Sequence, residues 1–142
     1  MDLDIEFCRN TLVVFGPDSE NVVNSLLNDD NNVDFNNVIR IPEQLDIGEI
    51  PIGEIPIEPQ SIRDKNKAEV GYPSWYEWRH DNWGSIWNAT NTEIVDANIV
   101  KFDTVFKPPV KIFEELCRKY PTHILALFYI DAGEAYDVLL HR

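Results

Sequence analysis

Four tryptophans, one arginine and two asparagines lie within a single short run, from Tyr72 to Asn88. Arg79 can stack on an indole ring and bind an anion, and nearby asparagine amides can add hydrogen bonds to the same ligand. One prediction is therefore a pocket for an anionic ligand, formed by Arg79, Asn82, Trp87 and Asn88. The alternative is structural, because large buried aromatic side chains dominate core energetics and Arg79 would then pair with a fixed carboxylate.

Signatures of catalysis or metal binding are weak. Glu77 and His80 stand three residues apart, which suits two metal ligands on one helix, but the other histidines, His123 and His141, lie far away in sequence. The chain has no glycine-rich phosphate loop, no nucleophile-elbow motif and no cysteine nucleophile with a histidine partner. The sequence therefore predicts no metal and no cofactor. It favours a non-enzymatic role, and an enzyme acting at the tryptophan-rich pocket stays open as the alternative.

The charge is strongly acidic and unevenly distributed. The net charge is −13, and residues 1–60 carry 13 acids against only Arg9 and Arg40. Such a field repels nucleic acid and anionic lipid, so we expect no direct binding to either. It favours a protein partner with a basic surface, and the candidate contacts are Glu49, Glu54 and Glu58. Imitation of nucleic-acid phosphate is one form of this hypothesis, and simple solubility is the alternative.

The tryptophan run predicts a helix. Ser74 suits the N-cap, Glu77 suits the third helical position of a capping box, and Gly84 suits the end. At about 100° per residue, the aromatic side chains cover one broad arc of this helix. We expect the structural motif to consist of Trp75, Tyr76, Trp78, Trp83 and Gly84.

The remaining chain predicts alternating strands and helices. The repeat IGEIP-IGEIP-IEP carries a proline in every unit, which forbids helix and central strand, so an extended insert is expected at about 46–60. The polar stretch 61–69 leads from it to the tryptophan run. Strands are expected at 5–15, 92–95, 99–106, 123–130 and 135–140, and amphipathic helices at about 17–27 and 108–119. Residues 35–41 are expected to form either a second strand or a partly irregular segment.

This order predicts one α+β domain over residues 1–142. Strands alternating with helices of this length favour a two-layer α/β sandwich with a mixed or antiparallel sheet. The ferredoxin-like split β-α-β, with an extra strand and the tryptophan-rich helix, fits best.

A family resemblance rests on the run WYEWRHDNWGSIWNA. It resembles the signature of the YubB-type ferredoxin-like proteins of phages, plasmids and other mobile elements. The matching positions are Trp75, Tyr76, Trp78, Asn82, Trp83, Gly84, Trp87 and Asn88. Two departures are His80-Asp81 before the asparagine and Ile86 where a lysine is common. The resemblance spans most of the chain outside the insert, and it implies a fold and a mobile-element context but no established activity.

The compartment is expected to be the cytosol of a bacterium or of an infected host cell. The N-terminus lacks the basic and apolar regions of a signal peptide, and no apolar run approaches the ~20 residues of a membrane span. Cys8 and Cys117 are far apart and in apolar surroundings, so we expect two reduced thiols.

Three functional hypotheses follow. The first is a non-enzymatic acidic interaction protein that modulates a host nucleic-acid-handling or defence protein. The second is a small anionic-ligand binder or enzyme with its pocket at Arg79. The third is a structural component of a particle, in which the apolar strand 135–140 pairs with another copy.

Overall fold

A nine-residue strand, β1 (Phe7–Phe15), lies at the centre of a five-stranded antiparallel sheet in the computed structural model. The structure describes residues 5–130 and 136–141. The strand order is β2-β3-β1-β4-β5, and every neighbouring pair is antiparallel. The other strands are β2 (Thr90–Asp96), β3 (Ile99–Val105), β4 (Ile124–Ile130) and β5 (Tyr136–His141). The predicted α+β class is confirmed, and of the two expected kinds of sheet, mixed or antiparallel, the structure has the antiparallel one.

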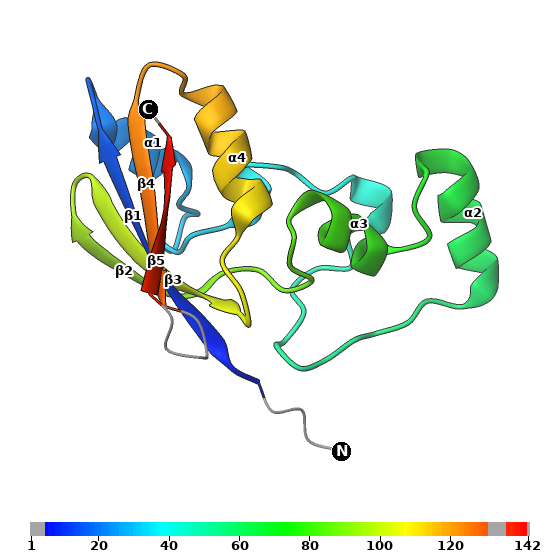
Figure 1. Ribbon diagram of the computed structural model, residues 1–142. Coiled ribbons are helices and arrows are strands. Elements are labelled where there is room, and N and C mark those ends of the chain that lie inside the picture. Colours follow the sequence, from blue (N-terminus) through cyan, green and yellow to red (C-terminus); the bar gives the residue numbers. More distant parts are fainter. Residues whose placement is uncertain (1–4, 131–135, 142) are drawn as a thin grey trace.

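One face of the sheet carries the core. Alternate side chains of β1, such as Leu12 and Val14, are buried while their neighbours are not, as the period of a strand requires. Two amphipathic helices supply the opposite layer: α1 (Ser19–Ser25) and α4 (Val110–Lys119) (Figure 1). Buried apolar residues of the two helices pack into the same cluster as this sheet face: Val22, Val23, Leu26, Ile112, Phe113 and Leu116.

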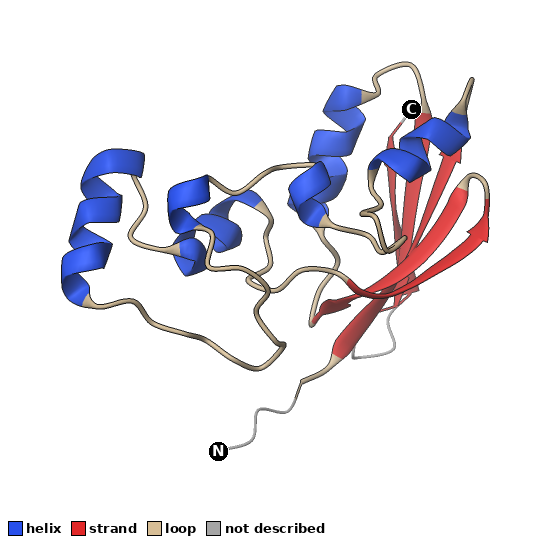
Figure 2. Cartoon of the chain, turned by 180° about the vertical axis from the view of Figure 1, so that it is seen from behind, coloured by secondary structure: helices blue, strands red, loops and turns tan. Residues whose placement is uncertain are grey.

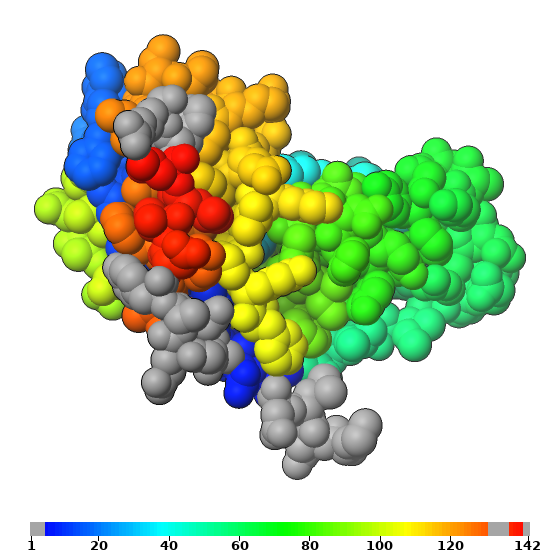
Figure 3. All heavy atoms as spheres, viewed as in Figure 1, coloured from blue at the N-terminus to red at the C-terminus, as the bar shows by residue number. Residues whose placement is uncertain are grey.

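A long excursion, residues 26–89, separates α1 from β2. It holds the helices α2 (Gln60–Val70) and α3 (Trp75–Asn82) and two short 3₁₀ helices, η1 (Phe35–Asn37) and η2 (Glu43–Leu45). The cartoon seen from behind shows α2 and α3 beside the sheet and α4, not over the sheet (Figure 2). The space-filling view shows the same segments as a lobe that extends away from the strands (Figure 3).

Two segments of the excursion were uncertain or wrongly predicted. Of the two alternatives for residues 35–41, the irregular segment is found and the strand is not, because Asp34 caps the 3₁₀ turn η1 by accepting a hydrogen bond from the Asn36 backbone N–H. The Asn36 side chain accepts from the Ile41 N–H in turn, so side chains replace the partner strand. Residues 61–69 were treated as a polar linker, yet they lie in α2. That helix was missed because it has no apolar stripe, and Asn66 is its buried residue.

The other elements lie close to their expected bounds. The helix from Ser74 and the hairpin of β2 and β3 are confirmed, and the segment between η2 and α2 is irregular, as its prolines indicate. α1 starts at Ser19, after Pro17 and not at it. β5 is an edge strand as expected, although Ala135 lies outside the described residues. No helix in the described ranges has the length and apolar character needed to cross a bilayer.

Candidate functional site

The tryptophan cluster is buried. Trp75 and Trp83 are fully inaccessible, and Trp78 and Trp87 are nearly so. Trp83 meets Trp78 and Phe35 edge to face at centroid distances of 5.8 and 5.7 Å. Because these rings contact each other and the core, their geometry favours an anchoring role over a ligand-lined pocket.

The indole N–H groups tie the irregular part of the excursion to α3 and the loop after it. Trp83 donates to the Ile39 carbonyl at 2.7 Å, Trp75 to Pro56 at 3.1 Å and Trp87 to Glu54 at 3.1 Å. Each bond satisfies a backbone carbonyl in a segment that has no ladder of its own. The tryptophans therefore fix the loop at Ile39 and the loop at Glu54–Pro56, in addition to filling the core.

The helix α3 that presents them begins and ends as the sequence predicts. Ser74 accepts a hydrogen bond from the Tyr76 N–H at 3.2 Å and donates to the Glu77 carboxylate. Gly84 has φ +76°, a left-handed conformation that glycine adopts without a steric penalty. Tyr76 is the exposed aromatic of the set.

Arg79 is almost completely buried within the aromatic cluster. Its guanidinium carbon lies 4.6 Å from the Trp83 ring centroid and 5.4 Å from that of Trp75. Nη1 donates to the Ile86 carbonyl at 3.2 Å, whereas the buried Nε has no hydrogen-bond partner among the described residues. Burial lowers the pKa of Arg79, and the charges of Asp46 and Asp34 act in the opposite direction. The side chain stays cationic, since arginine is effectively always protonated in proteins.

A polar hollow of about 570 Å³ opens next to Arg79. Four carboxylates lie in its wall, and Arg79 is the cation in the lining, so the lining carries a formal charge of −3. Amides from five asparagine side chains and the Thr90 hydroxyl complete the polar lining. The acidic residues are Asp30, Asp34, Asp46 and Glu49.

One wall is built by asparagine and aspartate turns. The Asn28 side chain accepts from the backbone N–H groups of Asp30 and Asn32 at 2.9 and 3.1 Å, which closes the turn after α1. Asp34 accepts from the Asn88 side chain at 2.9 Å, and Asn88 accepts from the Phe35 N–H at 2.9 Å. These bonds fix the loop after α1 against the segment that leads into β2.

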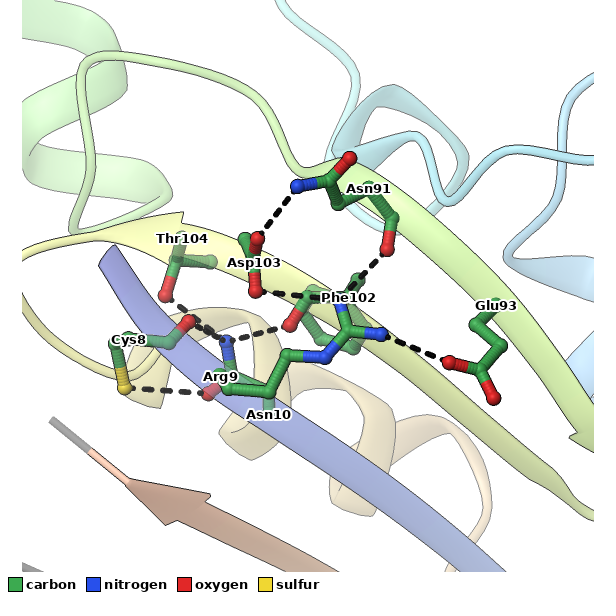
Figure 4. A network of polar contacts seen from close by, with 8 residues as sticks. All are labelled: Cys8, Arg9, Asn10, Asn91, Glu93, Phe102, Asp103 and Thr104. Carbon is green, nitrogen blue, oxygen red and sulfur yellow. Dashed lines mark hydrogen bonds and ion pairs between the residues drawn. The ribbon is translucent and has the colours of Figure 1, made fainter.

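The start of β2, which also lines the hollow, is held by a polar network (Figure 4). Arg9 on β1 donates to the Asn91 carbonyl at 2.7 Å and to Asp103 on β3 at 3.2 Å, and it pairs with Glu93 at 3.2 Å. The Asn91 side chain donates to Asp103 at 2.8 Å. Asn91 has φ +53°, a left-handed conformation that asparagine tolerates better than most residues. Arg9 thereby positions the part of β2 that lines the hollow.

Figure 4 also shows a second set of hydrogen bonds, which join β1 to β3. The fully buried Asn10 amide donates to the Cys8 carbonyl, the Phe102 carbonyl and the Thr104 hydroxyl at 3.1, 3.3 and 3.0 Å. A buried amide satisfied by three acceptors fixes the register of β1 against β3.

The structure brings some of the predicted site residues together and separates others. Arg79 and Asn88, predicted for an anionic ligand, and Glu49, predicted for a basic partner, all line the one hollow. Asn82 donates to the Trp78 carbonyl at the end of α3, and Trp87 is buried. Neither belongs to the lining, and neither do Glu54 and Glu58, which follow along the insert.

Three acids of the hollow were missed by sequence reasoning. Asp30 lies within the Asn28–Asn32 turn, Asp34 follows that turn, and Asp46 follows η2. The turn itself was recognisable as a polar cluster, but nothing in the sequence shows that it folds back toward Asn88 and Arg79. The signal that was available, an excess of unpaired acids in residues 1–60, indicates the region and not the site.

The lining suits binding more than chemistry. It offers carboxylates, amides, a hydroxyl and a guanidinium, and no imidazole, thiol or amine is among the described lining residues. Within residues 5–130 and 136–141, no three His, Cys, Asp or Glu side chains gather as a metal site would require. Burial raises the pKa of the Cys117 thiol to about 11, which keeps it protonated and unreactive at neutral pH.

Comparison of the chain with protein-family models, with curated proteins and with solved structures yields no match.

Proposed function

We propose that this chain is a non-enzymatic interaction protein whose acidic hollow binds a basic segment of a partner protein. The observation that carries the proposal is the convergence of Asp30, Asp34, Asp46 and Glu49 on one hollow of about 570 Å³. None of these carboxylates has an ion-pair partner within 4.0 Å among the described residues. Their charge is therefore available to a cation from outside.

The electrostatics favour a cationic guest. Coulomb energy between a carboxylate and an ammonium group 4 Å apart is about 1 kcal/mol in water and about 4 kcal/mol in the effective dielectric near a protein surface. Several carboxylates around one concavity add their potentials and focus the field there. The volume exceeds that of one side chain, so we expect a segment with more than one lysine or arginine.

The wider setting belongs to the same proposal. We propose, on the resemblance to YubB-type proteins, that the chain belongs to a phage or mobile element and acts in the cytosol on a host nucleic-acid-handling or defence protein. Such host proteins carry basic surfaces that bind nucleic acid, which an acidic hollow can occupy. The ferredoxin-like assignment is supported by the connections β1-α1-β2 and β3-α4-β4 together with the strand order β2-β3-β1-β4.

A charge-matched pair of variants tests the proposal. The hollow variant carries Asp30→Asn, Asp46→Asn and Glu49→Gln. The surface variant carries Glu20→Gln, Asp96→Asn and Glu114→Gln, three exposed acids outside the hollow. Both change the net charge equally, so general attraction is the same in the two. Titration with an oligolysine peptide at physiological ionic strength is expected to show weaker binding for the hollow variant alone. Equal affinity for both variants would show that only net charge matters.

A second candidate is recognition of an anionic group by Arg79. The specific observation is that Arg79, which lines the hollow, has a buried Nε without a hydrogen-bond partner in the part of the chain that the structure describes. Thermal unfolding with increasing inorganic phosphate tests it, because a ligand that binds the folded state raises Tm. Arg79→Lys keeps a positive charge but loses the planar group. If phosphate raises Tm of the wild-type protein and not of this variant, beyond the effect of chloride at equal ionic strength, the hollow binds anions as well.

A further inference from the structure

Arg79 has an unused hydrogen-bonding side next to the acidic hollow. The residue is only 4% exposed, and among the described residues only Ile86 accepts a hydrogen bond from its guanidinium, through Nη1. The buried Nε has no partner in that part of the chain. Nε and Nη2 together form the side of a guanidinium that can bind both oxygens of one carboxylate. A residue that lines the hollow thus keeps a carboxylate-binding side without an acceptor.

Two carboxylates of the hollow influence Arg79 without contacting it. Burial lowers the pKa of Arg79, and the charges of Asp46 and Asp34 act in the opposite direction. Neither carboxylate comes within 4.0 Å of the guanidinium nitrogens. Asp34 instead accepts from the Asn88 amide, and Asp46 accepts from the Gly48 N–H, both at 2.9 Å. These bonds hold both carboxylates in place, and neither carboxylate occupies the unused side of Arg79.

The charges of the hollow select among guests. A simple anion meets a lining of formal charge −3, which opposes its entry. A purely cationic segment is attracted, but it leaves the buried N–H of Arg79 without an acceptor, and such a donor is unfavourable because it has lost its hydration. A guest that carries both signs avoids both penalties. Its carboxylate meets Arg79, and its ammonium groups meet acids of the lining such as Asp30 and Glu49.

The surroundings of Arg79 favour the end of a peptide over its middle. The ring centroids of Trp83 and Trp75 lie 4.6 and 5.4 Å from the guanidinium carbon, and both rings are fully buried. A peptide that reaches Arg79 from the hollow therefore cannot continue past it through the tryptophan cluster. The α-carboxylate is the anion that a peptide carries at its end, and its capture is a recurring mode of peptide recognition.

We propose that the hollow binds the C-terminal end of a basic partner protein, with the α-carboxylate on Arg79 and lysine or arginine side chains on the surrounding acids. This inference rests on the proposed function, because it specifies which part of the basic segment enters the hollow. Asp30 and Glu49 are available for the cations of the guest, since neither forms an ion pair with a described residue.

Three acetylated peptides test the inference on the wild-type protein. The first, acetyl-Ala-Lys-Lys-Lys, ends in a free carboxylate, and the second is its C-terminal amide. The third is the amide of acetyl-Asp-Lys-Lys-Lys, which has the net charge of the first but carries its carboxylate at the other end. Calorimetric titration at physiological ionic strength is expected to show about tenfold tighter binding of the free acid, as for a charge-assisted hydrogen bond. Net charge alone predicts that the first amide binds more tightly than the free acid, because it has one positive charge more.

The hollow variant, with Asp30→Asn, Asp46→Asn and Glu49→Gln, separates this inference from the proposed function. If free acid and amide bind the wild type equally, and both bind the hollow variant more weakly, the chain-end inference is overturned and the basic-segment proposal stands. An aspartate peptide that binds as tightly as the free acid also overturns the inference, since the position of the carboxylate is then not recognised. If none of the peptides binds, both proposals are contradicted.

Two measurements locate the carboxylate at Arg79. In the NMR spectrum of the wild type, the Nε–H resonance of Arg79 is expected to shift with the free acid and not with its amide. Arg79→Gln removes the charge but keeps an amide donor, so the preference for the free acid should disappear, with circular dichroism confirming the fold. A resonance that responds equally to both peptides, or a preference that persists in the folded variant, contradicts the assignment. The NMR measurement needs no substitution and decides the question even if the variant does not fold.

Discussion

The tryptophan cluster and the acidic hollow both contain Arg79, and they differ in whether their polar groups have a partner within the protein. In the cluster, three indole N–H groups are matched to single backbone carbonyls, and the rings are shielded from water. In the hollow, four carboxylates face one concavity without a cation within salt-bridge distance among the described residues. Polar groups with a fixed hydrogen-bond partner thus secure the excursion, while carboxylates without a neutralising cation among the described residues keep their charge for a ligand.

The largest expected effect tests whether the cluster is an anchor. Trp83→Ala removes a fully buried ring, its edge contacts with Trp78 and Phe35 and its hydrogen bond to Ile39. We expect the free energy of unfolding to fall by about 3–5 kcal/mol, as for other large-to-small core changes. Urea unfolding followed by circular dichroism measures it. Tyr76→Ala, at the exposed position of α3, should cost about 1 kcal/mol or less, and equal losses would contradict the distinction.

A smaller effect tests whether the indole N–H groups hold the insert. Trp75→Phe keeps an aromatic ring but removes the bond to the Pro56 carbonyl, so we expect a loss of about 1 kcal/mol. Amide exchange in residues 46–59 should become faster, because a tether of this segment is lost. Trp78→Phe is the matched control, because the Trp78 indole N–H donates no hydrogen bond to any described residue. Faster exchange of the segment in both variants would assign the effect to lost volume alone.

A pH-dependent effect tests the capping of α3. Partial burial acts to raise the pKa of Glu77, but the hydrogen bonds from Ser74 and Arg63 outweigh it, so the pKa lies below the ordinary 4.5. A carboxylate with a lowered folded-state pKa stabilises the protein above the unfolded value and loses this effect as pH falls through the folded value. The stability difference between wild type and Glu77→Gln should therefore be constant down to about pH 4.5 and shrink below it.

Urea midpoints measured from pH 7 downward check this expectation. The same series on Glu114→Gln, an exposed glutamate of α4, gives the background for removing a carboxylate. A difference for Glu77→Gln that grows as the pH falls would have the wrong sign for a capping carboxylate.

The smallest effect concerns the hollow without its ligand. Asp30→Asn with Glu49→Gln reduces repulsion among the four carboxylates and leaves Asp34 and Asp46, whose charges act on Arg79. We expect a slight rise in Tm at low ionic strength that disappears when salt is added. Glu20→Gln with Glu114→Gln changes the net charge equally and should raise Tm less. A larger rise for this exposed pair would indicate that the hollow is not a centre of repulsion.

The sequence was informative where one local rule determines the outcome. Ser74, Glu77 and Gly84 predicted the bounds of α3, and the apolar stripes and alternations predicted β1, β3, α4 and β4. It could not decide between a strand and an irregular segment at residues 35–41, where side chains of Asp34 and Asn36 take the backbone hydrogen bonds that a strand would need. It failed at α2, a polar helix without periodicity.

The hollow could not be predicted from local sequence patterns for a different reason. Its lining comes from the turn after α1, the segment after η2, α3 and the start of β2, and these meet only through tertiary contacts. Arg79, Asn88 and Glu49 were chosen for their chemistry, but for two separate hypotheses. Their placement in one concavity depends on the Asn88 bonds to Asp34 and Phe35, which no pattern in the sequence indicates.

The most direct test of the division between anchor and recognition surface is to map where a cationic peptide binds. Titration of the isotope-labelled protein with oligolysine, followed by amide NMR, reports each segment separately. We expect the shifts to concentrate at 28–34, 46–52 and 88–91, with little change at Glu20, Asp96 and Glu114. Shifts spread evenly over all exposed acids, or centred on the tryptophan cluster, would contradict this account.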